Sequence, residues 1–299
     1  MIGYLFLGIA VISTTVKGYC GKKTSGYTKT YTDTTLANLL RMVICIVIGL
    51  ILVVTQNNLS YLAPSASLLG VSALSGIATA SLVITWLTSV KRGAYMMLDA
   101  FQTLGAAIPL ILCYFLFDEQ IKVTQWIGFF ILIFAVVIMC SYNNSIKEKL
   151  SPLSILLLIV VGASNGLVSF SQKLFIKNVQ GVPISVFNFY TYVFAAIVLL
   201  IFFLIFKKIE KEESSKSEKK PSIFYVYVTL MATLLFSYSY FLTSAAGYLD
   251  SAILYPLNQG GTLILTSLMS AIFFREKLTL KAIVGIILMF LGLIIINVL

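Results

Sequence analysis

The chain has 299 residues, of which 59% are hydrophobic and only 11% are charged. A soluble domain carries about 25% charged residues, so this composition excludes an ordinary soluble globular protein and favours a membrane protein. The formal net charge is +10 with no His. Because the Lys and Arg residues lie between long apolar runs, this charge is typical of membrane orientation and does not indicate nucleic-acid binding.

Ten apolar runs are long enough to be membrane-spanning helices. Each crossing needs about 20 residues, and a lipid-exposed backbone must satisfy its own hydrogen bonds. In chain order the predicted helices are Ile2–Val16, Leu36–Val54, Ala66–Ser89, Gly93–Phe117, Val123–Cys140, Leu153–Gln172, Pro183–Phe206, Ile223–Leu249, Ser251–Phe274 and Ala282–Leu299. Residues 207–221 are rich in charge of both signs, which predicts a solvated, mobile loop.

The second half of the chain repeats features of the first half. Gln259, Glu276 and Gly285 follow Gln102, Glu119 and Gly128 at one constant offset. This repetition predicts two five-helix repeats, residues 1–141 and 152–299, joined by a linker at residues 142–151. Five is an odd number of crossings, so the second repeat should enter the membrane from the opposite side. We therefore expect an all-α integral membrane protein with ten transmembrane helices, arranged as two inverted repeats around a central cavity.

The distribution of basic residues predicts an orientation. Lys and Arg gather in every second loop, as in Lys22, Lys23 and Lys91, whereas the alternate loops hold few, such as Lys122 and Lys177. Cytoplasmic loops are the ones enriched in Lys and Arg, which places the basic loops in the cytoplasm and both termini outside.

A family resemblance rests on the repeated motif. A Phe-x-Glu-x-x-Thr step precedes a last helix opened by Gly, and the motif is complete in the second copy and weaker in the first, where Lys122 and Ala135 depart from it. The residues that carry the resemblance are Lys17, Arg41, Glu119, Gly128, Lys173, Phe274, Glu276, Thr279, Gly285 and Gly292.

This pattern resembles the drug/metabolite transporter superfamily, most of all its bacterial EamA-type branch. The resemblance implies a ten-helix bundle in the bacterial plasma membrane that transports small organic molecules, often outward. It also implies cytoplasmic termini, in conflict with the charge distribution, so the orientation stays open.

Charged residues inside the apolar runs are candidates for coupling. A charge at a helix centre costs about 3 kcal/mol on insertion scales, so each needs a reason. Asp99 would bind a proton or a cationic group, while Lys17 and Lys173 would bind substrate anions or neutralise Asp99. The alternative is a hydrated pair near Lys91 for Asp99, and snorkelling at helix ends for the two lysines.

Larger polar and aromatic side chains recur at helical spacing inside several runs. Close helix packing explains a single Ser or Thr, but it does not require amides or tyrosines. A chamber of amides and aromatic rings would suit a small, flat organic solute. The expected substrate-binding residues are Trp86, Gln102, Asn165, Asn188, Tyr192, Tyr240, Tyr255 and Gln259.

The repeated glutamates and glycines are expected to be structural. Glu119 and Glu276 each lie where a helix ends, and a carboxylate there would cap the following helix. Gly128 and Gly285 open the last helix of each repeat. Pro109 and Gly105 mark a predicted bend in the fourth span.

These features predict a secondary active transporter, more specifically an exporter, that moves a small metabolite or drug by alternating access. Transport would be coupled to protons or to exchange. The sequence contains no P-loop motif, so neither ATP nor another cofactor is expected. A passive channel or scaffold is the alternative, and an intramembrane enzyme is disfavoured because HExxH and GxSxG motifs are missing. Expected partners are a small solute and the bilayer, not nucleic acid, with a monomer or a homodimer both open.

Overall fold

The computed structural model describes residues 1–91, 95–141, 152–210, 220–273 and 280–298. Within these ranges every regular element is a helix. The elements are α1 (Ile2–Ser25), α2 (Tyr31–Thr55), the short 3₁₀ helix η1 (Leu59–Leu62), α3 (Ala66–Lys91), α4 (Tyr95–Gly105), α5 (Ala107–Phe117), α6 (Val123–Ser141), α7 (Pro152–Asn178), α8 (Ile184–Glu210), α9 (Ser222–Ala246), α10 (Ser251–Phe273) and α11 (Leu280–Val298).

Each predicted span overlies a helix or, for the fourth span, two helices. Six helices in the described part, namely α1, α2, α3, α7, α8 and α9, are long and apolar enough to cross a membrane. The outward faces agree with a lipid environment, since Phe130, Phe134 and Val137 of α6 are exposed at helical spacing. The chain is a multi-pass membrane protein.

The fourth span is broken into α4 and α5 at a single residue. Ala106 separates the two helices, and Pro109 lies just inside α5. A proline has no N–H to donate to the carbonyl four residues earlier, which here is that of Gly105, so the helix bends at this point. The predicted bend is confirmed, and Asp118 in a left-handed conformation ends α5.

Several helices are longer than predicted at polar ends. The sequence predicts a polar loop after Val16, but α1 continues to Ser25. Thr30 caps α2 with its side chain, which accepts the N–H of Asp33. This capping box starts the helix at Tyr31, five residues before the predicted boundary.

The first residues of the predicted mobile loop at 207–221 belong to a helix. Residues 207–210 continue α8, and Glu210 accepts the backbone N–H groups of Tyr31 and Thr32 at the start of α2. Lys220 donates to the carbonyl of Tyr27 and to Asp33. Residues 211–219 lie outside the described residues.

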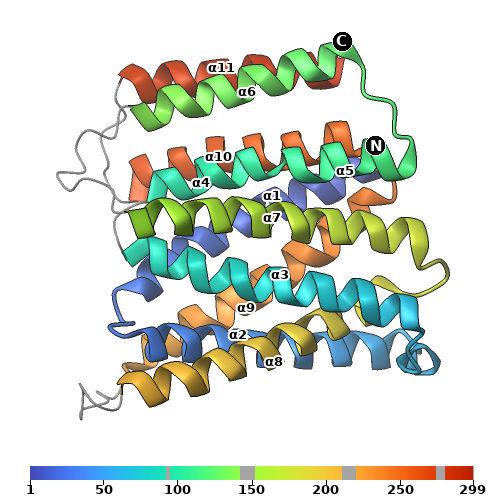
Figure 1. Ribbon diagram of the computed structural model, residues 1–299, viewed down its shortest axis with the longest axis vertical. Helices are drawn as coiled ribbons and strands as arrows, with labels where there is room; N and C mark the ends of the chain where they lie inside the picture. The colour runs from blue at the N-terminus through green and yellow to red at the C-terminus, as the bar shows by residue number, and fades with distance from the viewer. Residues whose placement is uncertain (92–94, 142–151, 211–219, 274–279, 299) are drawn as a thin grey trace.

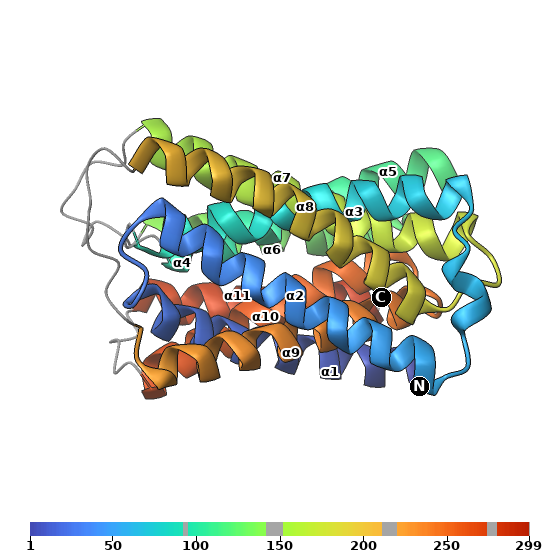
Figure 2. The same cartoon turned by 90° about the horizontal axis from the view of Figure 1, so that it is seen from below.

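The helices run along one common direction and pack in pairs (Figures 1 and 2). The main pairs are α1 with α9, α3 with α7, α2 with α8 and α6 with α11. The N-terminus and the end of α11 lie at the same end of the bundle (Figure 1), which we call the terminal end.

Glycines allow two of these packings to be very close. At the crossing of α6 with α11, a Cβ on Gly128 would lie 2.7 Å from the carbonyl oxygen of Gly292 and 2.5 Å from a side-chain carbon of Ile296. At the crossing of α4 and α5 with α7, a Cβ on Gly105 would overlap the carbonyl oxygen of Gly162. The packing explains why a glycine lies in the second turn of α6, and the corresponding Gly285 is buried in α11.

Candidate functional site

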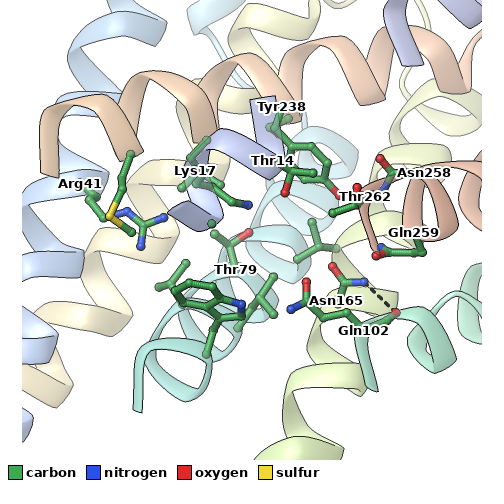
Figure 3. A pocket seen from close by; sticks show the side chains of 18 of the residues that line it. Thr14, Lys17, Arg41, Thr79, Gln102, Asn165, Tyr238, Asn258, Gln259 and Thr262 are labelled. Atoms are coloured by element: carbon green, nitrogen blue, oxygen red, sulfur yellow. Dashed lines mark hydrogen bonds between the residues drawn. The ribbon is translucent and has the colours of Figure 1, made fainter. Parts of the chain in front are cut away.

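A polar cavity lies inside the bundle, with a volume of about 60 Å³. Its lining comes from α1, α2, α3 and α4 in the first half of the chain and from α7, α8, α9 and α10 in the second half. Among the described residues, those of α5, α6 and α11 do not line it. The two halves therefore share one pocket (Figure 3).

Six of the predicted site residues line this pocket. The amides of Gln102, Asn165 and Gln259 lie close together at one end of it (Figure 3). Asn165 donates to the backbone carbonyl of Gln102 over 3.2 Å, which ties α7 to α4. The other three predicted residues that line the pocket are Trp86, Tyr192 and Lys17.

Three predicted binding residues do not line the pocket. Asn188 is fully buried and accepts a hydrogen bond from Ser239 at 2.9 Å. Tyr255 donates to the carbonyl of Ser169 at 2.6 Å. Tyr240 stacks on Phe236. Asn188 and Tyr255 thus join neighbouring helices, whereas Tyr240 contacts a ring of its own helix, and these observed contacts are structural.

Lys173 also lies away from the pocket, at the terminal end. Its Nζ is 3.0 Å from a carboxylate oxygen of Glu119, and it donates to the carbonyls of Ala246 and Leu249 where α9 ends. All these contacts hold helix ends together, and the coupling role of Lys173 stays a prediction.

Glu119 caps a different helix from the one expected. The sequence predicts a cap on the following helix, α6, but Glu119 accepts the backbone N–H of Ser251 at the start of α10, over 2.9 Å. The side chain of Gln125 instead accepts the N–H of Lys122 before α6. Glu119 thus joins the first half of the chain to the second half, and we call Glu119, Lys173 and Ser251 the terminal latch.

The electrostatics of the terminal latch favour an ionised carboxylate. Burial raises the pKa of Glu119, but the Ser251 N–H and the charge of Lys173 outweigh burial, so its pKa falls below the usual value. The latch is therefore an ion pair at neutral pH. It links the two halves of the chain at the terminal end of the bundle.

Two predicted residues cannot be placed in the site. Asp99 belongs to α4, but its side chain lies outside the described residues. Glu276 lies in the undescribed stretch 274–279.

The structure adds pocket residues that the sequence reading missed. Arg41, 3% exposed, lines the pocket from within α2, although the charge pattern places it at a loop flank. Its position inside a predicted apolar span could have identified Arg41 as a candidate site residue. Tyr238, Asn258 and Thr262 also line the pocket, and Asn258 donates to the Tyr238 hydroxyl over 3.2 Å.

The pocket has two chemically different ends. Arg41 and Lys17 lie at one end, and Gln102, Asn165 and Gln259 lie at the other, with Tyr238 between them (Figure 3). The Lys17 ammonium is 4.7 Å from the centre of the Tyr238 ring, within range of a cation–π interaction.

Several polar atoms of the pocket are buried without a hydrogen-bond partner among the described residues. They belong to both ends of the pocket, and they are Arg41 Nε, Gln102 Nε2, Asn258 Oδ1 and Thr262 Oγ1. Buried polar atoms are normally hydrogen-bonded. Unused donors and acceptors around one cavity are what a polar ligand would satisfy.

Comparisons with known proteins agree with the sequence and the fold. The model of the EamA-like transporter family matches residues 152–298. One solved crystal structure, described only as that of a protein, is 12% identical with a TM-score of 0.76, and the match covers 99% of this chain and 96% of that one. At this identity the likeness shows the fold alone. No curated protein matches the sequence.

Proposed function

The chain is an EamA-type member of the drug/metabolite transporter superfamily by its match over residues 152–298, and we propose that it is a secondary active transporter working by alternating access. The observation that carries this proposal is one polar pocket built jointly by both halves of the chain. Its substrate would be a small organic metabolite exported across the bacterial plasma membrane.

The helix pairing supports two inverted five-helix repeats. The first repeat would run from α1 to α6, with α4 and α5 counted as one span, and the second repeat would run from α7 to α11 in the same order. Exchanging the two halves then turns the pair α1–α9 into the pair α7–α3. Both pairs occur, and α2–α8 and α6–α11 map onto themselves. A pseudo-two-fold axis in the membrane plane produces this pattern.

Individual contacts repeat in the same way. Asn38 of α2 donates to the carbonyl of Val83 in α3, and Asn188 of α8 accepts from Ser239 in α9. The amide of an asparagine thus ties the second helix to the third helix in each half. Because equivalent contacts occur in both halves, they support a mechanism in which each half can adopt the conformation of the other half.

The size of the pocket favours a small metabolite over a drug. Pockets for drug-sized ligands measure about 300–1,000 Å³, whereas the cavity here is about 60 Å³. Gln102, Asn165 and Gln259 would hydrogen-bond the solute, with Trp86 and Tyr192 as aromatic walls.

The terminal latch supports a state that is closed at one end. Glu119 and Lys173 link the two halves at the terminal end, whereas the pocket is lined by Lys17 and Trp86, nearer the basic loops. If the basic loops face the cytoplasm, this conformation is sealed on the outside. Asp99 remains our proposed proton-binding residue for coupling.

The test is a thermal-shift screen of metabolites on the purified protein. Any solute that stabilises it should lose affinity by about tenfold in Gln102→Ala and Gln259→Ala, because each variant removes one hydrogen bond. Gln180→Ala is the matched control, since Gln180 is exposed in the turn between α7 and α8. Equal affinity in all three variants would contradict a pocket bound by these amides.

A passive channel is the second candidate. A channel needs a continuous polar path, whereas the terminal latch is a buried ion pair that links the two halves at the terminal end. A measurement of solute exchange across proteoliposomes would separate the two candidates.

A further inference from the structure

The pocket carries positive charge that the proposed function leaves without a purpose. Among the described residues that line it, Lys17 and Arg41 are charged, and both are basic. Arg41 is the more informative of the two because it lies within α2 with only 3% of its surface exposed. A buried charge is costly unless it is paired or hydrogen-bonded.

Neighbouring groups hold the Arg41 guanidinium in place. Asn38 donates from its Nδ2 to the carbonyls of Thr34 and Val83, each over 3.1 Å. These two bonds fix the amide so that its Oδ1 accepts Nη1 of Arg41 at 2.7 Å. Such support is typical of a side chain that must keep one orientation.

The guanidinium nevertheless keeps unused hydrogen-bonding capacity. Its Nε is buried and has no partner among the described residues, and the described ion pairs involve Lys173, Lys177 and Lys220 but not Arg41. A guanidinium binds the two oxygens of a carboxylate or a phosphate through parallel N–H groups.

The far end of the pocket complements this basic end. Unpartnered Gln102 Nε2, Asn258 Oδ1 and Thr262 Oγ1 offer donors and acceptors but no charge. Figure 3 shows Arg41 and Lys17 at one end and these side chains at the other. A matching ligand has an anionic group at one end and a neutral hydrogen-bonding group at the other.

We infer that the substrate is a small organic anion, whose carboxylate or phosphate group binds Arg41 while its neutral polar end binds the amides of Gln102 and Asn258. This inference rests on the proposed function and adds the chemical class of the substrate. Lys17 would add positive charge near the same group.

The test uses Trp86 as a reporter, because it lines the pocket. The chain has two tryptophans, and Trp126→Phe leaves Trp86 alone. Its fluorescence is followed while each probe is added, in pairs that share a skeleton: succinamate with succinamide, and glycerol 3-phosphate with glycerol. The two acids distinguish a carboxylate from a phosphate.

We expect saturable binding of at least one acid and none of its neutral partner. Arg41→Gln should weaken that binding by at least about 30-fold, since a buried charge pair loses one partner. Lys122→Gln, an equal change of charge at an exposed site, should leave it unchanged. If Arg41→Gln does not fold, the acid and neutral pair on the otherwise unchanged protein still decides.

Binding of neither acid, equal binding of acid and neutral partner, or full binding by Arg41→Gln would each overturn the inference. Failure of the inference is distinct from failure of the proposed function. If neutral solutes are exchanged across proteoliposomes and acids are not, the carrier stands without an anionic substrate. If no solute is exchanged, the carrier itself fails.

Discussion

Gly105→Ala is expected to destabilise the helix bundle strongly. Its new Cβ would overlap the carbonyl oxygen of Gly162 in α7. Backbone atoms contact each other on both sides of this crossing, since a Cβ on Gly162 would lie 2.6 Å from the carbonyl oxygen of Phe101. A carbonyl cannot rotate away as a side chain can, so the helices must separate. Overpacking costs about 1–3 kcal/mol, and we expect the upper end of that range.

The measurement is the melting temperature and the fraction of monodisperse protein in detergent. Gly70→Ala is the control, because Gly70 is exposed in α3 and a Cβ there would meet nothing within 4 Å. That change should be neutral or stabilise the protein by about 0.5–1 kcal/mol through helix propensity. Equal melting temperatures for the two variants would show that α4 and α5 do not approach α7 this closely.

Glu119→Gln is expected to cost about 3 kcal/mol, because removing one member of a buried ion pair leaves the other charge uncompensated. Glu119 is 8% exposed, so solvent screens the pair with Lys173 only slightly. The variant also weakens the acceptor for the Ser251 N–H. We expect a clear fall in melting temperature, with the start of α10 loosened from the first half of the chain.

Two further variants distinguish the loss of the ion pair from a general loss of stability. Asp118→Asn is the control, since Asp118 is the exposed neighbour of Glu119 and Asn tolerates its left-handed backbone. It should melt like the unchanged protein. Adding Lys173→Met to Glu119→Gln should restore part of the loss, because no buried charge then remains unpaired. A double variant that is as unstable as the sum of the two single variants would argue against the ion pair.

The order of the helices was predictable because hydrophobic runs are a strong signal in a membrane protein. The bend at Pro109 was also predictable, since the missing N–H is a local property. The starts and ends of the helices were less predictable. The polar segment before Leu36 resembles a loop, but the capping box of Thr30 and Asp33 makes it the first turn of α2.

The pocket was harder to predict, because spacing shows that a helix has a polar stripe but not which way the stripe faces. On α9 the sequence favoured Tyr240, whereas the structure turns Tyr238 into the pocket. Two residues differ by about 200° around a helix, so the choice reverses the face. The α9 helix contacts α1, α2 and α8, which leaves more than one side for polar groups.

The partner of Glu119 was not predictable from local sequence. Glu119 precedes α6, so a cap on that helix was the natural expectation. The start of α10 comes close to it only through packing of the two halves of the chain. The same packing brings Lys173 to Glu119 and removes it from the pocket.

The most direct test of the central claim is counterflow in proteoliposomes. The vesicles are loaded with the solute that stabilises the protein best, unlabelled, and diluted into a trace of the same solute in radiolabelled form. A carrier that alternates between two closed ends should accumulate label transiently above its equilibrium level, and Gln259→Ala should reduce this overshoot. Flux of label that rises only to equilibrium, without an overshoot, would contradict alternating access and leave a channel.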